Sequence, residues 1–473
     1  MKNLPTRTGI EHFPKPEIVG DDQLVPLANG MQSRYINLDN AASTPSFQSV
    51  FDYLHRFLPY YSSVHRGAGF KSKISTELYD QSRRIIGDFI GVNLDENTVI
   101  FTKNTTEAIN KLSFRLPLER DSVVLTTEME HHSNDLPWRS KATTLHISVT
   151  PQGMLDLLDL KNKLKENKGK VALVCISGAS NVTGIVQPIH YIAELAHSFG
   201  AKILVDAAQL LPHRAMDMKP DKDPGHIDFL VFSAHKMYAP FGTGVLVAPK
   251  EVFQDTEPEY SGGGTVSSVT LDDIRWAGLP DREEAGSPNV IGAVTLAKTI
   301  SELQKMGMHN ISNHEHELTE YALGELNSID NVSIYGNLQA DRVGVISFNI
   351  EGIHHAEVAA ILSFEYGIAV RNGCFCAHPY VVSLLGLESE DIKRWQAETD
   401  SGNKAHMPGL VRVSFGCYNT KEDVDLFLRA IKNIAHLKSK SRYTLNMITG
   451  EYYPAMSINP SVKSFLETKE LNY

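Results

Sequence analysis

An acid and a lysine that follow two predicted strands are the residues of this sequence best suited to do chemistry together. Asp206 ends the apolar run Ile203-Leu204-Val205, and Lys236 follows a second apolar run 30 residues further on. Open α/β sheets bring the carboxyl ends of their strands to one crevice. A lysine there can form a Schiff base with an aldehyde, and a carboxylate can keep a pyridine nitrogen protonated. The pair predicts a site in which pyridoxal 5'-phosphate (PLP) is bound to Lys236.

Each of these residues taken alone has a simpler explanation. Asp206 would be a helix N-cap, and Lys236 would be a solvated side chain. The residues around the lysine, Ser233-Ala234-His235-Lys236 followed by 237–244, favour the cofactor site. Gln209 comes three residues after Asp206, and we expect it to hydrogen-bond the ring hydroxyl from the same turn.

The elements that must position this pair alternate along residues 37–292. Seven runs read as strands, and several are apolar throughout, as expected where both faces of a strand are buried. The predicted strands are 98–101, 122–126, 144–148, 171–176, 202–205, 229–232 and 244–247. Amphipathic helical stretches lie between them, such as 106–116 and 189–199. The pattern predicts the α/β class, with a mostly parallel seven-stranded sheet covered by helices on both faces.

The pattern changes after residue 292. Two long helical stretches, 293–306 and 310–328, predict a connector to a smaller α+β domain. That domain is expected to contain strands at 332–335, 343–350 and 411–414, and helices at 355–366 and 421–436. The polar stretch 388–406 predicts a surface insertion or mobile loop. The expected division is 1–30, an N-terminal extension packing on the small domain; 31–300, the large PLP-binding domain; 301–443, the small domain; and 444–473, a tail without clear periodicity.

Composition and charge limit the classes of partner. The 473 residues carry a formal net charge of -11, which argues against nucleic acid or an anionic membrane as a partner and favours a small-molecule substrate. No apolar run has the length of a membrane span or a signal peptide, so we expect a cytoplasmic protein. The four cysteines, Cys175, Cys374, Cys376 and Cys417, are expected to be free thiols. Their spacing does not predict a metal site.

Residues 38–434 resemble the class V aminotransferase group of fold-type I PLP enzymes. Within that group, the sequence is most similar to the SUF-type cysteine desulfurases and selenocysteine lyase. The resemblance implies a homodimer and assigns several residues to the cofactor. The segment 102–107 resembles the phosphate loop, and it opens a predicted helix whose free N–H groups favour an anion. The residues implied to bind PLP besides Lys236, Asp206 and Gln209 are Thr105, Thr106, Ser233 and His235 at the phosphate, His131 stacked on the ring, and Asn181 near its hydroxyl.

The resemblance also assigns residues to the substrate and to the dimer interface. Arg412 is implied to grip the substrate α-carboxylate, a task suited to a planar bidentate donor. Asn181 approaches the same carboxylate, and Ala41 lines its pocket. Ser287 is implied to reach the phosphate in the partner subunit, and 65–67 to face the active site across the dimer interface.

Cys376 decides the reaction that the resemblance implies. A thiolate there would attack the sulfur or selenium of the substrate, giving a persulfide on the enzyme and alanine as product. Arg371 is a plausible positive charge beside it. A free cysteine is otherwise usually a buried small hydrophobe. Many SUF-type relatives have two histidines where this chain has Cys374-Phe375. Cys-Phe-Cys is similar to the aminotransferase-like domain of molybdenum-cofactor sulfurases, which leaves the substrate and the sulfur acceptor open.

The sequence therefore supports one main hypothesis and two alternatives. The main one is a desulfurase that removes sulfur from L-cysteine, or selenium from L-selenocysteine, and passes it to an acceptor protein. Cys374 would resolve the persulfide or simply pack. The second is a class V aminotransferase, epimerase or C–S lyase that uses PLP without a persulfide. The third is a non-catalytic scaffold of the same fold.

Overall fold

The computed structural model describes residues 13–65, 67–119, 121–254, 257–437, 439 and 441–455. The first 12 residues of the expected N-terminal extension, and residues 456–473 of the expected tail, lie outside the described residues. In the part of the chain that the structure describes, no helix has both the length and the apolar character needed to cross a membrane.

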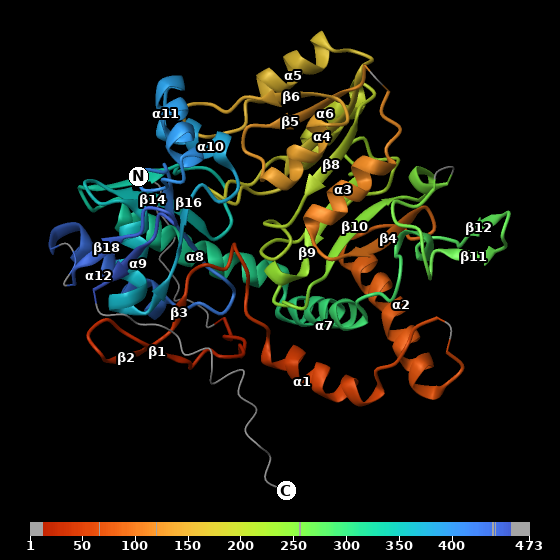
Figure 1. Cartoon of the computed structure of the whole chain (residues 1–473), viewed down its shortest axis with the longest axis horizontal. Coiled ribbons are helices and arrows are strands. Elements are labelled where there is room, and N and C mark those ends of the chain that lie inside the picture. Colours follow the sequence, from red (N-terminus) through yellow and green to blue (C-terminus); the bar gives the residue numbers. More distant parts are fainter. Residues whose placement is uncertain are drawn as a thin grey trace, which may run out of the picture.

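A seven-stranded sheet forms the centre of the larger part of the molecule (Figure 1). In spatial order its strands are β4 (Asn97–Thr102), β10 (Gly244–Pro249), β9 (Phe229–Ser233), β8 (Lys202–Asp206), β7 (Val171–Ser177), β5 (Val123–Thr127) and β6 (Thr143–Ile147). β10 runs antiparallel to both of its neighbours, whereas the pairs from β9 to β6 are parallel. Each predicted strand lies within two residues of an observed one, so the prediction of a mostly parallel sheet is confirmed.

Helices cover both faces of this sheet, because every central strand is apolar on both sides. On one face, Ile100, Leu204 and Phe229 pack against α3 (Thr105–Arg115) and Trp138 of α4 (Leu136–Arg139). The other face packs against helices that share one large core with it. These helices are α1 (Gln48–Phe57), α2 (Phe70–Ile90), α5 (Leu157–Glu166), α6 (Ile189–Ser198) and α7 (Val290–Met306).

A four-stranded antiparallel sheet forms the second part of the molecule. Its order is β13 (Val332–Tyr335), β14 (Val345–Ile350), β17 (Leu410–Ser414) and β16 (Arg371–Gly373). Its core is shared with α8 (Met308–Leu326), α9 (His355–Tyr366) and α12 (Lys421–Leu437). The buried side chains of α7 pack in the core of the larger part, and those of the carboxyl-terminal half of α8 pack in the core of the smaller part. We therefore propose to keep the domain division near residue 300.

The described N-terminal segment lies on the smaller part. β1 (Leu24–Pro26) and β2 (Gln32–Arg34) form a hairpin, and the Ala28 N–H donates to the Phe364 carbonyl of α9. β3 (Ile36–Asn37) then pairs in parallel with β15 (Ile368–Ala369). These contacts support the proposed placement of the N-terminal extension.

Three segments differ from the sequence-based expectations or lay outside them. The polar stretch 388–406, expected to be an insertion or mobile loop, contains helix α11 (Ser389–Asp400), which follows α10 (His378–Leu385). Helix formers and two acids in the first turn stabilise α11 although it buries no side chain. Residues after 443 form a hairpin of β18 (Tyr443–Leu445) and β19 (Tyr452–Pro454). β11 (Val266–Val269) and β12 (Ile274–Trp276) form a second hairpin, which projects from the molecule (Figure 1).

Candidate active site

The residues predicted to carry the chemistry surround one cavity of about 350 Å³ at the carboxyl ends of β5, β7, β8 and β9. The predicted residues that line it are Ala41, Thr105, Thr106, His131, Asn181, Asp206, Gln209, Ser233, His235, Lys236, Arg371, Cys376 and Arg412. Ser287 is the exception. It lines a different cavity, of about 470 Å³, together with His65 and Gly264.

Asp206 and Lys236 reach the cavity from adjacent strands. Asp206 is the last residue of β8, and Lys236 lies in the short helix Ala234–Lys236 that follows β9. Asp206 is buried and accepts a hydrogen bond from the Ala208 N–H at 3.0 Å. Burial raises the pKa of Asp206, which the Ala208 N–H and the charge of Lys236 oppose. Burial also lowers the pKa of Lys236 to about 8, although the charge of Asp206 acts in the other direction.

His131 enters the same cavity as a neutral ring. Its Nδ1 accepts a hydrogen bond from the Ser133 N–H at 3.1 Å, so the proton of the neutral imidazole is on Nε2. Burial, together with the charge of Lys236, lowers the pKa of His131 to about 3. A neutral ring suits stacking on an aromatic cofactor, the role predicted for His131.

Glu130 is a residue that the sequence analysis did not assign. Its buried carboxylate accepts hydrogen bonds from the hydroxyls of Thr127 and Ser177, and from the Asn134 side chain, all at 2.7 Å. Burial nevertheless raises its pKa to about 7. Through its bond to Ser177, Glu130 holds the segment that contains His131 close to the end of β7.

One end of the cavity is lined by hydroxyls and the start of α3. Asn104 caps this helix by accepting a hydrogen bond from the Glu107 N–H. The Thr105 N–H donates to Ser233 Oγ at 2.8 Å, and the Thr106 and Ser133 hydroxyls lie 2.7 Å apart. Strand β10 passes so close that a Cβ at Gly244 would lie 2.4 Å from the Asn104 carbonyl carbon. The hydroxyls of Thr105, Thr106, Ser133 and Ser233 and the N-terminal end of α3 make this end suitable for an anion.

The opposite end carries two arginines joined by one acid. Arg412 of β17 and Arg371 of β16 lie opposite each other in the register of the small sheet. The Asp39 carboxylate lies between the two guanidinium groups and offsets their repulsion. Its Oδ2 is 3.0 Å from Arg371, and its Oδ1 is 3.0 Å from Arg412. Arg412 is buried and also donates to the Asn181 carbonyl at 2.9 Å. Among the described residues its buried Nε has no hydrogen-bond partner.

The loop of Cys376 adopts an unusual backbone conformation. Phe375 (φ 51°) and Cys376 (φ 54°) both lie in the left-handed region, which residues with a side chain rarely adopt. Asn181 Nδ2 donates to the Phe375 carbonyl and the His132 N–H to the Cys376 carbonyl, both at 2.7 Å. The Arg412 guanidinium lies 4.8 Å from the centre of the Phe375 ring. These contacts hold an exposed Cys376 thiol at the cavity.

Cys374 differs from Cys376 in being buried. Its thiol donates to the Pro408 carbonyl at 3.1 Å, and burial raises its pKa to about 12. These features favour packing, one of the two roles considered for Cys374, over resolution of a persulfide.

Helix α11 contacts the Cys376 loop through stacked rings. Trp395 stacks on His378 with 5.6 Å between ring centres, and His378 stacks on His132 at 4.7 Å. The sequence analysis missed this contact, as it did Asp39.

A lysine and an acid at adjacent strand ends, in a mostly parallel sheet followed by a small α+β part, define the fold-type I architecture of PLP-dependent enzymes. The chain belongs to the class V aminotransferase family, whose model matches residues 36–427. It is 35% identical over 412 residues to a probable cysteine desulfurase of Halalkalibacterium halodurans, covering 85% of this chain and 93% of the relative. It is 34% identical to a cysteine desulfurase of Haloferax volcanii, covering 87% of this chain and 90% of that protein.

Solved structures show the same likeness. The apo structure of a cysteine desulfurase from Thermococcus onnurineus superimposes with a TM-score of 0.75 and 33% identity, covering 85% of this chain and 94% of that one. An Escherichia coli cysteine desulfurase in an S-sulfonic acid form gives a TM-score of 0.72 and 27% identity, covering 85% and 95%. Family membership and fold thus agree with the resemblance found in the sequence.

Proposed function

We propose that this chain binds PLP on Lys236, because the cavity fits each part of that molecule. The hydroxyls and N–H groups at the start of α3 suit the phosphate, and neutral His131 suits the ring. Asp206 Oδ2 has no hydrogen-bond partner among the described residues, so it can accept a hydrogen bond from a protonated ring nitrogen. Gln209 uses its amide nitrogen to donate to the Ala41 carbonyl at 2.6 Å, which also positions the predicted substrate segment.

When bound, PLP supplies an aldehyde for Schiff-base chemistry and a ring that withdraws electrons from the substrate α-carbon. The residues of this chain hold and move the protons. Lys236 Nζ, with its lowered pKa, is partly neutral near pH 8 and can accept and return the α-proton. Asp206 keeps a negative charge beside the ring nitrogen, and His131 excludes water from one face.

The pKa of Lys236 predicts how the apoprotein takes up PLP. Only the neutral amine attacks an aldehyde, and the pKa is about 8. We expect the rate of PLP attachment, followed by visible absorption after rapid mixing, to rise about tenfold per pH unit below that pKa and to level off above it. Asp206→Asn removes a charge that raises this pKa, so its midpoint should lie at lower pH. A midpoint of about 10 in the wild type would show a solvent-like lysine and contradict the assignment.

We propose further that the substrate is a small amino acid whose α-carboxylate contacts Arg412 and Asn181. Arg412 is preorganised for this because Asp39 and the Asn181 carbonyl already fix two of its nitrogens. Its charge is buried and incompletely paired, which favours an anionic ligand. Arg371 extends the same positive end of the cavity from β16.

The reaction that the geometry supports best is removal of sulfur from L-cysteine. The observation that carries this proposal is an exposed Cys376 thiol in the same cavity as Lys236. The Cys376 thiolate attacks the substrate sulfur, a new S–S bond forms, and the C–S bond breaks with its electron pair left on the carbon skeleton. Protonation of that skeleton gives alanine. The terminal sulfur of the Cys376 persulfide is then available to an acceptor protein. The relatives named as cysteine desulfurases support this choice.

Product analysis with a panel of amino acids tests the proposed function. With L-cysteine we expect alanine and an enzyme-bound persulfide in equal amounts in the first turnover, and with L-selenocysteine we expect alanine and selenium. A keto acid, an inverted amino acid or pyruvate would instead identify a transaminase, an epimerase or a C–S lyase. A purified protein with no visible cofactor absorption after incubation with PLP would favour the non-catalytic scaffold.

We also propose that the enzyme is a homodimer in the cytoplasm. Ser287 lies in a second cavity, apart from the Lys236 cavity, as expected for a residue that serves the partner subunit. Tyr61, an exposed aromatic side chain, lines the same cavity, and Tyr60 and Leu271 are further large apolar side chains exposed on the surface. The four cysteines are all free, which suits a reducing compartment.

A further inference from the structure

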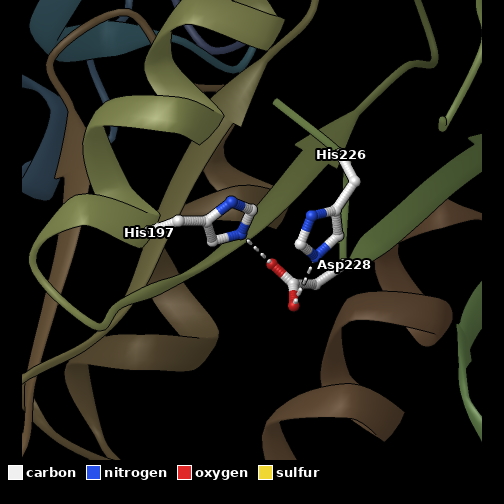
Figure 2. Close-up of side chains that lie close together, drawn as sticks. All are labelled: His197, His226 and Asp228. Carbon is white, nitrogen blue, oxygen red and sulfur yellow. Dashed lines mark hydrogen bonds and ion pairs between the residues drawn. The ribbon is translucent and has the colours of Figure 1, made fainter. Parts of the chain in front are cut away.

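Two histidines and an aspartate converge at the opposite end of β9 from Lys236 (Figure 2). His197 lies in the last turn of α6, and His226 and Asp228 lie just before β9. His197 Nε2 is 2.9 Å from Asp228 Oδ2, and His226 Nε2 is 3.7 Å from Asp228 Oδ1. One potential ligand atom from each residue lies within 4.8 Å of the other two. None of the three takes part in the proposed reaction.

Hydrogen bonds fix the tautomer of both neutral rings. His197 Nδ1 lies 2.7 Å from the Pro224 carbonyl oxygen, and His226 Nδ1 lies 2.7 Å from the Asp223 carbonyl oxygen. A carbonyl only accepts, so both Nδ1 atoms carry a proton and both Nε2 atoms present lone pairs. The two lone pairs face the carboxylate of Asp228 (Figure 2). Without a metal, a proton on His197 Nε2 satisfies the contact with Asp228, and a bound metal ion would take the place of that proton. A carbonyl-bound Nδ1–H is the usual arrangement of a metal-binding histidine.

We propose that His197, His226 and Asp228 bind one zinc(II) ion. Two imidazole nitrogens and one carboxylate oxygen are ligands that zinc prefers, with water completing the shell, whereas magnesium and calcium prefer oxygen alone. The Nε2–Oδ distances of 2.9 and 3.7 Å run to the two different oxygens of Asp228. Both are close to the ~3.3 Å edge of a tetrahedron with zinc bonds of ~2.0 Å, so a small rotation of the carboxylate brings one oxygen into position for both rings. The two rings, stacked with 4.2 Å between centres, tilt toward each other when the ion binds.

The Ile203 N–H and the Lys202 ammonium group both contact Asp228, the first holding it in place and the second competing with a bound cation. Asp228 is held in place because it also accepts a hydrogen bond from the Ile203 N–H of β8 at 2.8 Å. Lys202 places a competing positive charge 3.8 Å from Asp228 Oδ1, but its side chain is 41% exposed and also contacts Glu251. The lysine can therefore turn to solvent when zinc binds. The bound ion joins the end of α6 to the starts of β8 and β9, so it stabilises the large sheet without entering the cavity.

Substitution by asparagine tests the site with little disturbance. The asparagine amide nitrogen lies near the position of Nδ1 and keeps the donor to the carbonyl, but nothing replaces Nε2. Bound zinc is measured by equilibrium dialysis and elemental analysis on the untagged holoprotein. We expect one zinc per chain, and affinity lowered about tenfold or more in His197→Asn and in His226→Asn. Lys202→Gln should bind zinc more tightly, because the competing charge is gone.

His190→Asn is the matched control, since its Nδ1 makes the same type of bond, to the Gly225 carbonyl at 2.8 Å, but it is outside the group of three. It should bind zinc as the wild type does. Cys376→Ala should also bind zinc as the wild type does, which excludes the exposed thiol as the ligand. Zinc should raise the melting temperature of the wild type and of His190→Asn but not of His226→Asn. Absence of zinc from the wild type, or equal zinc affinity in the wild type and both asparagine variants, would overturn the proposal.

Discussion

Cys376→Ala should form no persulfide and should release alanine from L-cysteine at least about 10³-fold more slowly than the wild type. The physical reason is that Cys376 provides the one exposed thiol among the four cysteines, and it lines the cavity that contains Lys236. Without it, the substrate sulfur has no nucleophile to accept it. The measurement combines alanine quantification with mass spectrometry of the intact chain after one turnover, where the persulfide adds one sulfur atom.

Cys374→Ala is the control, only two residues away. The Cys374 thiol is buried with a pKa of about 12, so its loss should leave persulfide formation at Cys376 intact. Visible absorption by bound PLP should be normal in both variants. Alanine production at the wild-type rate by Cys376→Ala would rule out the thiol as sulfur acceptor, and the aminotransferase or lyase alternatives would then take precedence.

The second large effect is expected for Lys236→Ala, which should lose the visible absorption of lysine-bound PLP and about 10³-fold or more of the activity. In the proposed mechanism the lysine is both the attachment point and the group that moves the α-proton, and its lowered pKa makes the neutral amine available for both. Absorption spectra of the purified protein after incubation with PLP, and alanine release from L-cysteine, report the two roles separately.

Lys250→Ala serves as the control for Lys236→Ala. Lys250 follows β10, and its Nζ donates to the Asp95 carbonyl at the opposite end of the sheet. Its replacement should change neither the spectrum nor the rate. A Lys236→Ala protein that kept the lysine-bound absorption would place the cofactor on another residue and remove the basis of the proposed mechanism.

The sheet and the pair that it positions could be predicted because their signals are local. Runs such as 171–176 and 229–232 are apolar throughout, which marks a strand buried on both faces. Once the strands were known, Asp206 and Lys236 had to meet, because the carboxyl ends of adjacent parallel strands lie at one edge. The family resemblance then supplied residues from other parts of the chain.

Other parts of the site have no local signal. Asp39 matters because it contacts Arg371 and Arg412, which are more than 300 residues away in the chain and come together only when the small sheet forms. The stretch that contains α11 was expected to be a surface insertion or mobile loop because it is polar and lacks an apolar face. Its stability comes from helix propensity and charges in its first turn, with Trp395 stacked on His378 of α10.

The left-handed backbone at Phe375 and Cys376 has a consequence for how Cys376 is held at the cavity. Each such residue is typically about 1–3 kcal/mol above its relaxed conformation. The restraints that oppose relaxation are the hydrogen bonds from Asn181 and His132 and the contact of the ring with Arg412. Once these contacts release, Phe375 and Cys376 can relax to a backbone conformation of lower energy. The two hydrogen bonds and the ring contact therefore hold Cys376 at the cavity against the preference of its own backbone.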